Sequence, residues 1–321
     1  MRFENLIVEF ENDSVSIPVF RFGKLNSSKR LVVLGGVHGN EINGICILKK
    51  IINFLSDSLL ESNLDCEIIC LPVVNVLGFH NFTRRFKNKD LNRSYTDNPI
   101  NFAEHICFEI FQKFIKNATY VLDFHDSGSN YELLLHSRIA PNNQLLLDMT
   151  SAMGIEFTLV RKPQTGMLAE YALKRGVLVL TVESGGGGVV HDTYIENLLT
   201  GFKNFLNKFE LLKESKLPLK TKKLDLIELK TRFKYRLDTT SIIKYHVVLG
   251  QKIKKSDLLC TIYQPSTASE FNLYSKKDGY LFSLPSKNIV TSKQVICDIA
   301  LDCCDYNIIS NPEIFELVKV I

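Results

Sequence analysis

The sequence predicts an α/β protein in which a mixed β-sheet is flanked by helices and followed by a smaller all-β domain. Three observations predict this. Over residues 1–212, apolar runs with strand character alternate with stretches of helical periodicity, which is typical of an α/β sheet. Near Leu212 the pattern changes to short strands separated by turns. The 45% of hydrophobic residues is enough to build a sizeable core.

The predicted elements of the first domain follow one another along the chain. Apolar runs predict strands at Leu6–Phe10, Val15–Phe20, Leu31–Val37, Cys66–Val74, Tyr120–Phe124, Glu132–His136, Phe157–Arg161 and Val177–Val182. Helical periodicity predicts helices at Glu41–Leu55, Asn101–Lys116, Asn142–Met153, Met167–Lys174 and Asp192–Phe209. In the last helix, Tyr194, Leu198, Phe202 and Phe205 fall on one face, as expected of a helix that packs on a sheet.

Residues 213–321 are predicted to form the all-β domain. Strands are expected at Ile242–Val248, Leu258–Tyr263, Gly279–Ser283 and Gln294–Ile299. This pattern resembles the folded β-sandwich of lipoyl and biotinyl carriers, and such a domain could cover an active site. The stretch 213–236 carries nine Lys/Arg and three Asp/Glu. It is either a surface that attracts anions or a linker with the first strands of the new domain, and the second interpretation is favoured.

The composition argues against several classes of protein. A formal net charge of +4 over 321 residues, with scattered lysines, gives no basis for nucleic-acid binding. The N-terminal segment lacks an apolar secretory run, and no run approaches the ~18 apolar residues that span a bilayer. We therefore expect a soluble cytoplasmic protein without nucleic-acid or membrane partners. The oligomeric state is left open, homo-oligomers included.

A glycine-rich turn carries the first candidate metal ligands. Residues 35–41 read Gly-Gly-Val-His-Gly-Asn-Glu and directly follow the apolar run Leu31–Leu34. His38 and Glu41 can therefore bind one metal ion from a single turn, and His125 at the end of another apolar run could be the third ligand. Two nitrogens and a carboxylate, with one position open, are typical of a catalytic zinc site.

Further polar groups follow other predicted strands. Arg85 precedes the loop Asp90-Leu91-Asn92-Arg93, whose side chains could bind an anion. Glu183 follows the strand Val177–Val182 and precedes four glycines. Because ligands bind at the carboxyl ends of strands in α/β sheets, Glu183 is expected at the same edge as the metal ligands.

Taken together, these motifs resemble the succinylglutamate desuccinylase/aspartoacylase family of the zinc carboxypeptidase-like superfamily. The resemblance rests on Gly-Gly-x-His-Gly-x-Glu, Arg-x5-Leu-Asn-Arg, Asp-Phe-His and a late strand-end Glu, over about residues 30–190. It implies a zinc-carboxypeptidase-like mixed sheet. It also implies one Zn²⁺ per chain, bound by His38, Glu41 and His125.

The resemblance further implies roles for four residues. Glu183 would be the general base that takes a proton from water and returns it to the leaving amine. Arg85 would polarise the amide carbonyl and stabilise the oxyanion. Asn92 and Arg93 would hold a substrate carboxylate.

One part of the family pattern is missing from the sequence. The resemblance implies a further arginine shortly before Glu183 for recognition of the substrate side chain. Residues 170–175 read Glu-Tyr-Ala-Leu-Lys-Arg in that stretch, so Arg161, Lys174 and Arg175 are the candidates.

We therefore predict a zinc-dependent amidohydrolase that removes an acyl group from a small, carboxylate-bearing N-acyl amino acid. Two alternatives stay open. The first is a carboxypeptidase acting on short peptides, and a β domain that overhangs the site would argue against it. The second is a non-catalytic protein that binds metal or ligand on the same fold. Glu183 argues against the second, because binding alone does not need a base.

Overall fold

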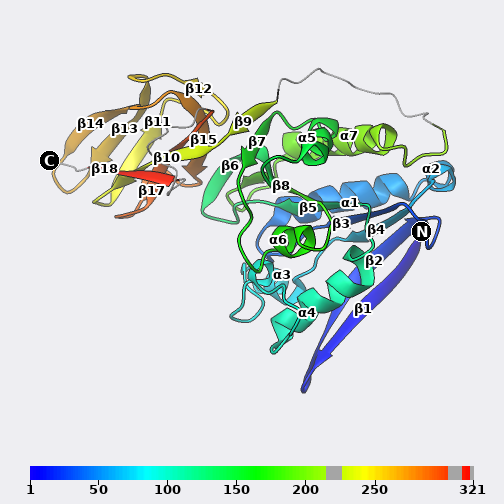
Figure 1. Ribbon diagram of the computed structural model, residues 1–321. Coiled ribbons are helices and arrows are strands. Elements are labelled where there is room, and N and C mark those ends of the chain that lie inside the picture. Colours follow the sequence, from blue (N-terminus) through cyan, green and yellow to red (C-terminus); the bar gives the residue numbers. More distant parts are fainter. Residues whose placement is uncertain (215–225, 303–312, 319–321) are drawn as a thin grey trace.

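The computed structural model describes residues 1–214, 226–302 and 313–318, which form an α/β region joined to a β region (Figure 1). The α/β region has three layers. Helices α1 (Ile42–Leu55), α5 (Gln144–Ala152) and α7 (Asp192–Lys208) cover one face of the sheet, and α4 (Phe102–Ile110) and α6 (Leu168–Leu173) cover the other. Shorter helical elements lie at Ser58–Asn63 (α2), Val76–His80 (α3), Leu91–Arg93 (η1) and Phe111–Ile115 (η2). Two separate apolar clusters fill the two helix–sheet interfaces.

The sheet of the α/β region is mixed. Its strands lie in the order β1 (Arg2–Phe10), β2 (Asp13–Gly23), β4 (Glu67–Leu71), β3 (Arg30–Leu34), β5 (Tyr120–His125), β8 (Val179–Gly186) and β6 (Tyr131–Ile139), with β7 (Phe157–Val160) beside β6. The central strands β4, β3, β5 and β8 are parallel, whereas β2 and β6 pair antiparallel to their neighbours. The carboxyl ends of β3, β5 and β8 therefore meet at one edge, which is where an α/β sheet binds ligands.

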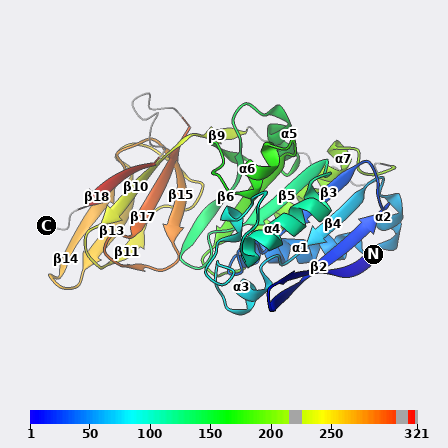
Figure 2. The same ribbon diagram turned by 60° about the horizontal axis from the view of Figure 1, so that its bottom comes forward.

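All the described elements of the C-terminal region are strands. They are β9 (Ile227–Leu229), β10 (Thr231–Leu237), β11 (Ser241–Tyr245), β12 (Lys252–Ile253), β13 (Leu258–Gln264), β14 (Ser269–Tyr274), β15 (Gly279–Pro285), β16 (Ile289–Val290), β17 (Val295–Leu301) and β18 (Glu313–Val318). Strands β14, β13, β11 and β16 form a separate sheet, and an apolar cluster fills the space between the two sheets as in a sandwich. The other strands extend the large sheet, because β15 pairs with β6 and β9 pairs with β7 (Figure 2).

The predicted fold class is confirmed, and so are the helices. Each of the five predicted helices is found with its ends within two residues, when α4 and η2 are taken together. Strand β8 extends four residues beyond its predicted end, so that Glu183 lies inside the strand. The predicted domain boundary after residue 212 stays a prediction, and residues 215–225 beyond it lie outside the described part of the chain.

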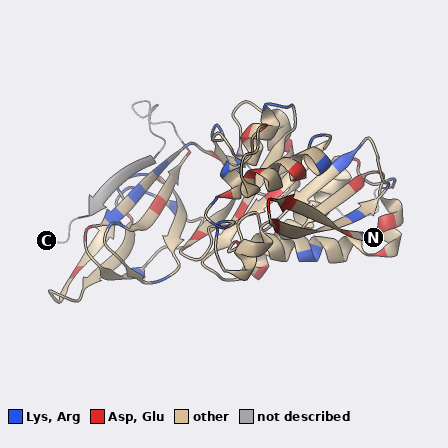
Figure 3. Ribbon diagram, turned by 90° about the horizontal axis from the view of Figure 1, so that it is seen from below, with Lys and Arg blue, Asp and Glu red and all other residues tan. Residues whose placement is uncertain are grey.

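Figure 3 shows acidic and basic residues interspersed along the ribbon in both regions. Part of the basic stretch 213–236 forms β10, in which buried Phe233, Tyr235 and Leu237 alternate with half-buried basic residues. This alternation is that of a strand with one face in a core. No helix within the described residues is long and apolar enough to cross a bilayer.

Candidate active site

Two imidazoles and one carboxylate converge at the carboxyl edge of the sheet. His38 Nδ1 lies 2.7 Å from Glu41 Oε1, and His125 Nδ1 lies 2.8 Å from Glu41 Oε2. The two Nδ1 atoms are 3.2 Å apart. All three side chains are 2% exposed, and their ligand atoms lie within 4.8 Å of one another. The structure thus brings together the three residues that the sequence predicts as metal ligands.

Each imidazole has a carboxylate behind it. His38 Nε2 lies 3.0 Å from Asp90 Oδ1, and His125 Nε2 lies 2.9 Å from Asp123 Oδ2. A neutral imidazole that donates its Nε2 proton to a carboxylate keeps a lone pair on Nδ1. Both Nδ1 lone pairs then face the same point as Glu41. This carboxylate–histidine arrangement is the one that orients histidine ligands in metal sites.

The charge of the cluster favours a divalent cation. Burial lowers the pKa of His38 and of His125, but the surrounding carboxylates outweigh it and raise both pKa values above their usual range. The field that favours protons on these nitrogens favours a metal ion in the same way. Glu41, Asp90 and Asp123, with Arg84 beside them, leave a formal charge of −2 when both imidazoles are neutral. Two neutral imidazoles and one carboxylate, in surroundings with this net negative charge, fit Zn²⁺.

The backbone around His38 requires glycine at two positions. Gly36 has a φ of +59°, in the left-handed region where a side chain is strained. At Gly39 a Cβ atom would lie 1.9 Å from the carbonyl carbon of Gly78 in α3, so only glycine allows this close approach. The tight turn lets Glu41 serve as the N-cap residue of α1, three residues after His38. The spacing of His38 and Glu41 in the sequence and the backbone of this turn therefore both bring the two side chains together.

Asn43 and Asp126 fix the loops around the ligands. Asp126 Oδ2 accepts hydrogen bonds from the Asn43 backbone N–H at 2.9 Å and from its side-chain amide at 3.0 Å. The Asn43 amide also donates to the Val189 carbonyl, and its oxygen accepts from the His191 N–H. The start of α1, the end of β5 and the loop after β8 are thereby held together.

The two neighbouring arginines lie differently. The Arg84 guanidinium donates to Glu41 Oε1 at 2.9 Å and lies 3.0 Å from Asp90 Oδ2. The guanidinium of Arg85 donates instead to the Asn88 carbonyl at 2.9 Å. The geometry therefore brings Arg84 to the cluster, whereas the sequence spacing pointed to Arg85.

Glu183 lies next to His125 across two parallel strands. The two residues are paired in the register of β5 and β8, and Asp123 pairs with Thr181. Since side chains alternate along a strand, His125 and Glu183 project from the same face of the sheet. Glu183 is 7% exposed, and its Oε1 lies 3.3 Å from the Arg138 guanidinium on β6. No motif pointed to Arg138, because its place depends on the antiparallel pairing of β6 with β8.

Asn92 and Arg93 take up different positions. Asn92 is buried, and its Oδ1 accepts a hydrogen bond at 2.9 Å from the N–H of Leu168, the first residue of α6. This contact caps a helix whose own N-cap residue has no capping side chain. The Arg93 side chain is exposed and lines a cavity beside α6.

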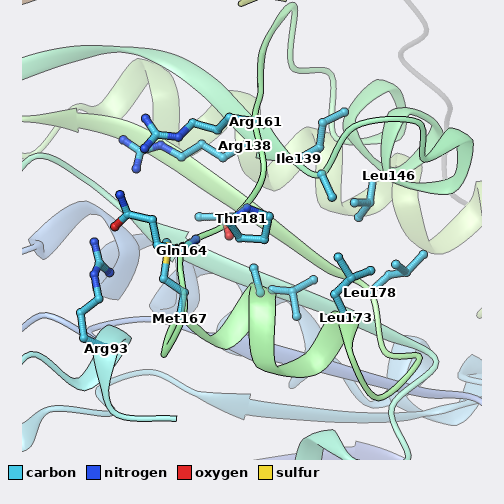
Figure 4. A pocket seen from close by; sticks show the side chains of 14 residues that line it. Arg93, Arg138, Ile139, Leu146, Arg161, Gln164, Met167, Leu173, Leu178 and Thr181 are labelled. Carbon is cyan, nitrogen blue, oxygen red and sulfur yellow. Dashed lines mark hydrogen bonds between the residues drawn. The ribbon is translucent and has the colours of Figure 1, made fainter. Parts of the chain in front are cut away.

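That cavity has a volume of about 100 Å³ and two unlike ends (Figure 4). Guanidinium groups gather at one end, where Arg93 lies across from Arg138 and Arg161. The other end is lined by aliphatic side chains, among them Ile139, Leu146, Leu173 and Leu178. Of the three candidates for a further substrate cation, Arg161 therefore lies at a cavity. Lys174 and Arg175 pair with Glu170 and Asp97.

Comparison with known proteins identifies the family. The sequence profile of the succinylglutamate desuccinylase/aspartoacylase catalytic domain matches residues 27–209, which is more than half of the chain. The chain belongs to the succinylglutamate desuccinylase/aspartoacylase family. The resemblance seen in the sequence motifs is thereby confirmed. None of the curated protein sequences compared with the chain matches it.

Solved structures extend the likeness to the β region. The product-bound ectoine utilization protein EutE (DoeB) from Ruegeria pomeroyi has a TM-score of 0.78 at 17% identity, covering 93% of this chain and 94% of its own. A succinylglutamate desuccinylase/aspartoacylase from Rhodobacter sphaeroides has a TM-score of 0.77 at 18% identity, with 94% and 95% covered. An aspartoacylase family protein from Mesorhizobium loti has a TM-score of 0.74 at 19% identity, with 94% and 95% covered. The fold of this family member thus includes both regions.

Proposed function

We propose that this protein is a zinc-dependent amidohydrolase that removes the acyl group from a small N-acyl amino acid. The observation that carries the proposal is the convergence of His38, Glu41 and His125, with a carboxylate behind each imidazole. Membership of a desuccinylase/aspartoacylase family supports the reaction class.

His38, Glu41 and His125 would hold the metal, and Asp90 and Asp123 would orient the two imidazoles. When bound, zinc supplies Lewis acidity, which polarises a carbonyl group and makes water more acidic near neutral pH. The remaining work falls to side chains of this chain.

Glu183 is the candidate for proton transfer. It lies beside His125 and is nearly buried, and the Arg138 guanidinium at 3.3 Å holds its carboxylate in place. From there the carboxylate would take a proton from the attacking water and deliver it to the nitrogen of the leaving amine. A positioned base of this kind is worth roughly 10²–10⁴-fold in rate.

Two arginines are the candidates for charge stabilisation and binding. Arg84 reaches the ligand cluster, so its guanidinium could stabilise the oxyanion that forms when water attacks the amide carbonyl. Arg93 at the cavity would hold the substrate carboxylate. Asn92 would position Arg93 and α6, because its side chain caps that helix.

The β region supports a small substrate. Ser286, which follows β15, donates through its Oγ to the Ser129 carbonyl and through its N–H to the Asn130 carbonyl. The loop 127–130 directly follows His125 and Asp126, so these hydrogen bonds attach the β region to the segment that leaves the ligand cluster. We infer that the β region covers the site and limits access for long peptides, which favours a deacylase over a carboxypeptidase.

The test is a set of assays on the zinc-loaded protein with Glu183→Gln as the main variant. N-acetyl amino acids and dipeptides are offered side by side, and bound zinc is measured by atomic emission. We expect release of acetate by the wild type and at least about a 10²-fold loss in E183Q with zinc retained. Dipeptide cleavage without deacylation would favour the carboxypeptidase, and the absence of any hydrolysis would leave a binding protein.

A further inference from the structure

The two-ended cavity of Figure 4 adjoins the candidate active site. Arg138 connects them, because it lines the cavity and contacts Glu183 at 3.3 Å. Thr181 also lines the cavity and lies two residues before Glu183 on the same face of β8. On the other side, Arg93 follows the loop whose Asp90 contacts His38. A molecule with its amide at the metal ligands could therefore extend into the cavity.

The guanidinium end of the cavity suits one carboxylate. Arg93, Arg138 and Arg161 face it, and Glu183 offsets part of their charge. The α-carboxylate of an amino acid is the group that planar guanidinium groups bind best. A carboxylate bound at this end therefore also fixes the position of the α-carbon, to which the amino acid side chain is attached.

The far end of the cavity excludes a second carboxylate. Ile139, Leu146, Leu173 and Leu178 offer only aliphatic surface there. Ile139 and Leu146 are buried and Leu173 is 38% exposed, so a carboxylate moved from water to this surface loses part of its hydration without gaining a partner. An aliphatic group gains free energy from the same transfer. When the α-carboxylate is bound at the guanidinium end, the far end thus favours an aliphatic side chain over one that carries a carboxylate.

We propose that this cavity selects N-acyl amino acids whose side chain is aliphatic, with the α-carboxylate at the guanidinium end and the side chain against the leucines. The proposal rests on the amidohydrolase function proposed above and names its substrate class. An engineered cavity of roughly 150 Å³ holds one benzene ring. The two ends of this cavity together have a smaller volume of about 100 Å³, so an aliphatic side chain suits the space beside the carboxylate better than an aromatic ring does.

The proposal is tested with N-acetyl derivatives of alanine, 2-aminobutyrate, norvaline, leucine, phenylalanine and aspartate. Each added methylene is expected to raise kcat/KM by about fourfold up to leucine. The phenylalanine and aspartate derivatives are expected at least about tenfold below leucine. A preference for aspartate, or a series that is flat from alanine to leucine, would overturn the proposal.

A matched pair of variants locates the effect in the cavity. Ala169 lines the cavity, whereas Ala118 is equally half-buried against the same apolar cluster but lies outside the lining. Ala169→Leu should lower the leucine-to-alanine ratio of kcat/KM at least about tenfold, because it fills space meant for the substrate. Ala118→Leu should leave that ratio at the wild-type value. Equal ratios in the two variants would refute the assignment to this cavity.

Binding measurements separate this proposal from the proposed function. Calorimetric titration of the wild type with the same N-acetyl amino acids reports affinity whether or not they are hydrolysed. An affinity that rises with the length of the amino acid side chain, without hydrolysis, would refute the amidohydrolase function and support the aliphatic specificity of the cavity. Hydrolysis that favours aspartate would support the amidohydrolase and refute the aliphatic specificity. The absence of both binding and hydrolysis would refute both proposals.

Discussion

Glu41 and Glu67 are both buried carboxylates of the α/β region, yet their surroundings differ. Glu67 is fully buried and lies between two cations, with Arg21 Nη1 at 2.7 Å and Arg30 Nη2 at 2.9 Å. Glu41 lies between two imidazoles whose far nitrogens contact carboxylates. Its one permanent cation is Arg84, whose side chain is 43% exposed.

The difference separates a structural ion cluster from the cluster that we propose as a metal site. Around Glu67 the protein matches negative charge with positive charge, since Arg21 on β2 and Arg30 on β3 face Glu67 on β4, and Glu4 pairs with Arg21 from the other side. Around Glu41 negative charge exceeds positive charge, and two lone pairs face each other. An uncompensated buried charge is costly, so the second arrangement is stable only with a proton or a metal ion in it.

The largest effect is expected from His38→Ala. Removing one ligand should abolish stoichiometric zinc binding and lower kcat/KM roughly 10³-fold or more, because the catalytic groups act as a unit. Atomic emission and an acetate-release assay measure the two quantities. The control is His80→Ala, since His80 is exposed and contacts none of the ligands. A full complement of zinc in H38A would show that the cluster is not the metal site.

The second largest effect is expected from Arg84→Ala, and Arg85→Ala is its control. If Arg84 stabilises the oxyanion, its removal should lower kcat roughly 10²-fold. Arg85→Ala should stay close to wild type, because that guanidinium contacts a backbone carbonyl of its own loop. Steady-state kinetics on one N-acetyl amino acid measures both variants. The reverse ranking would restore the role that the sequence spacing assigned to Arg85.

A smaller effect is expected from Asp123→Asn. An amide behind His125 no longer favours the same tautomer and charge, so zinc affinity should fall about 10–100-fold. Competition with a chromophoric chelator at fixed pH measures the affinity. Asp65→Asn is the control, because the Asp65 side chain is 49% exposed and lies 3.8 Å from Lys29. Unchanged affinity in D123N would mean that Asp123 only supports the fold.

The convergence of the three proposed metal ligands could be predicted because local sequence determines their surroundings. His38 and Glu41 share one turn, and His125 ends a strand whose apolar run is plain in the sequence. Arg138 could not be predicted, because its contact with Glu183 depends on the pairing of β6 with β8 and on a register shift between Leu133 and His136. Arg84 and Arg85 are adjacent, and only the backbone course of their loop decides which of them reaches Glu41.

The long-range pairing in the β region could not be predicted for the same reason. The sequence pattern located β11, β13, β15 and β17, and it placed first strands without bounds in 213–236, where β9 and β10 lie. It missed β12, β14, β16 and β18. It also carried no sign that β15 pairs with β6 and so extends the large sheet. Strand propensity reports a local backbone preference, whereas pairing partners are chosen by packing across the fold.

The smallest effect on activity is expected from Glu67→Gln, which tests the buried carboxylate that was compared with Glu41. The amide removes the carboxylate shared by Arg21 and Arg30, whose side chains are 20% and 15% exposed, and leaves Glu4 at 2.7 Å from Arg21 as the remaining counter-charge. We expect the free energy of unfolding to fall by about 2–3 kcal/mol, below the range for fully buried pairs because water reaches both guanidinium groups. Urea denaturation of the metal-loaded protein measures this change, and zinc content should stay at the wild-type value. Glu196→Gln is the matched control, because Glu196 pairs with Lys50 at 2.7 Å on the surface, where water screens the pair, and its loss should change the free energy of unfolding far less. Equal losses in the two variants would mean that burial does not distinguish Glu67, and a loss of zinc in E67Q would mean that the two carboxylates are not independent.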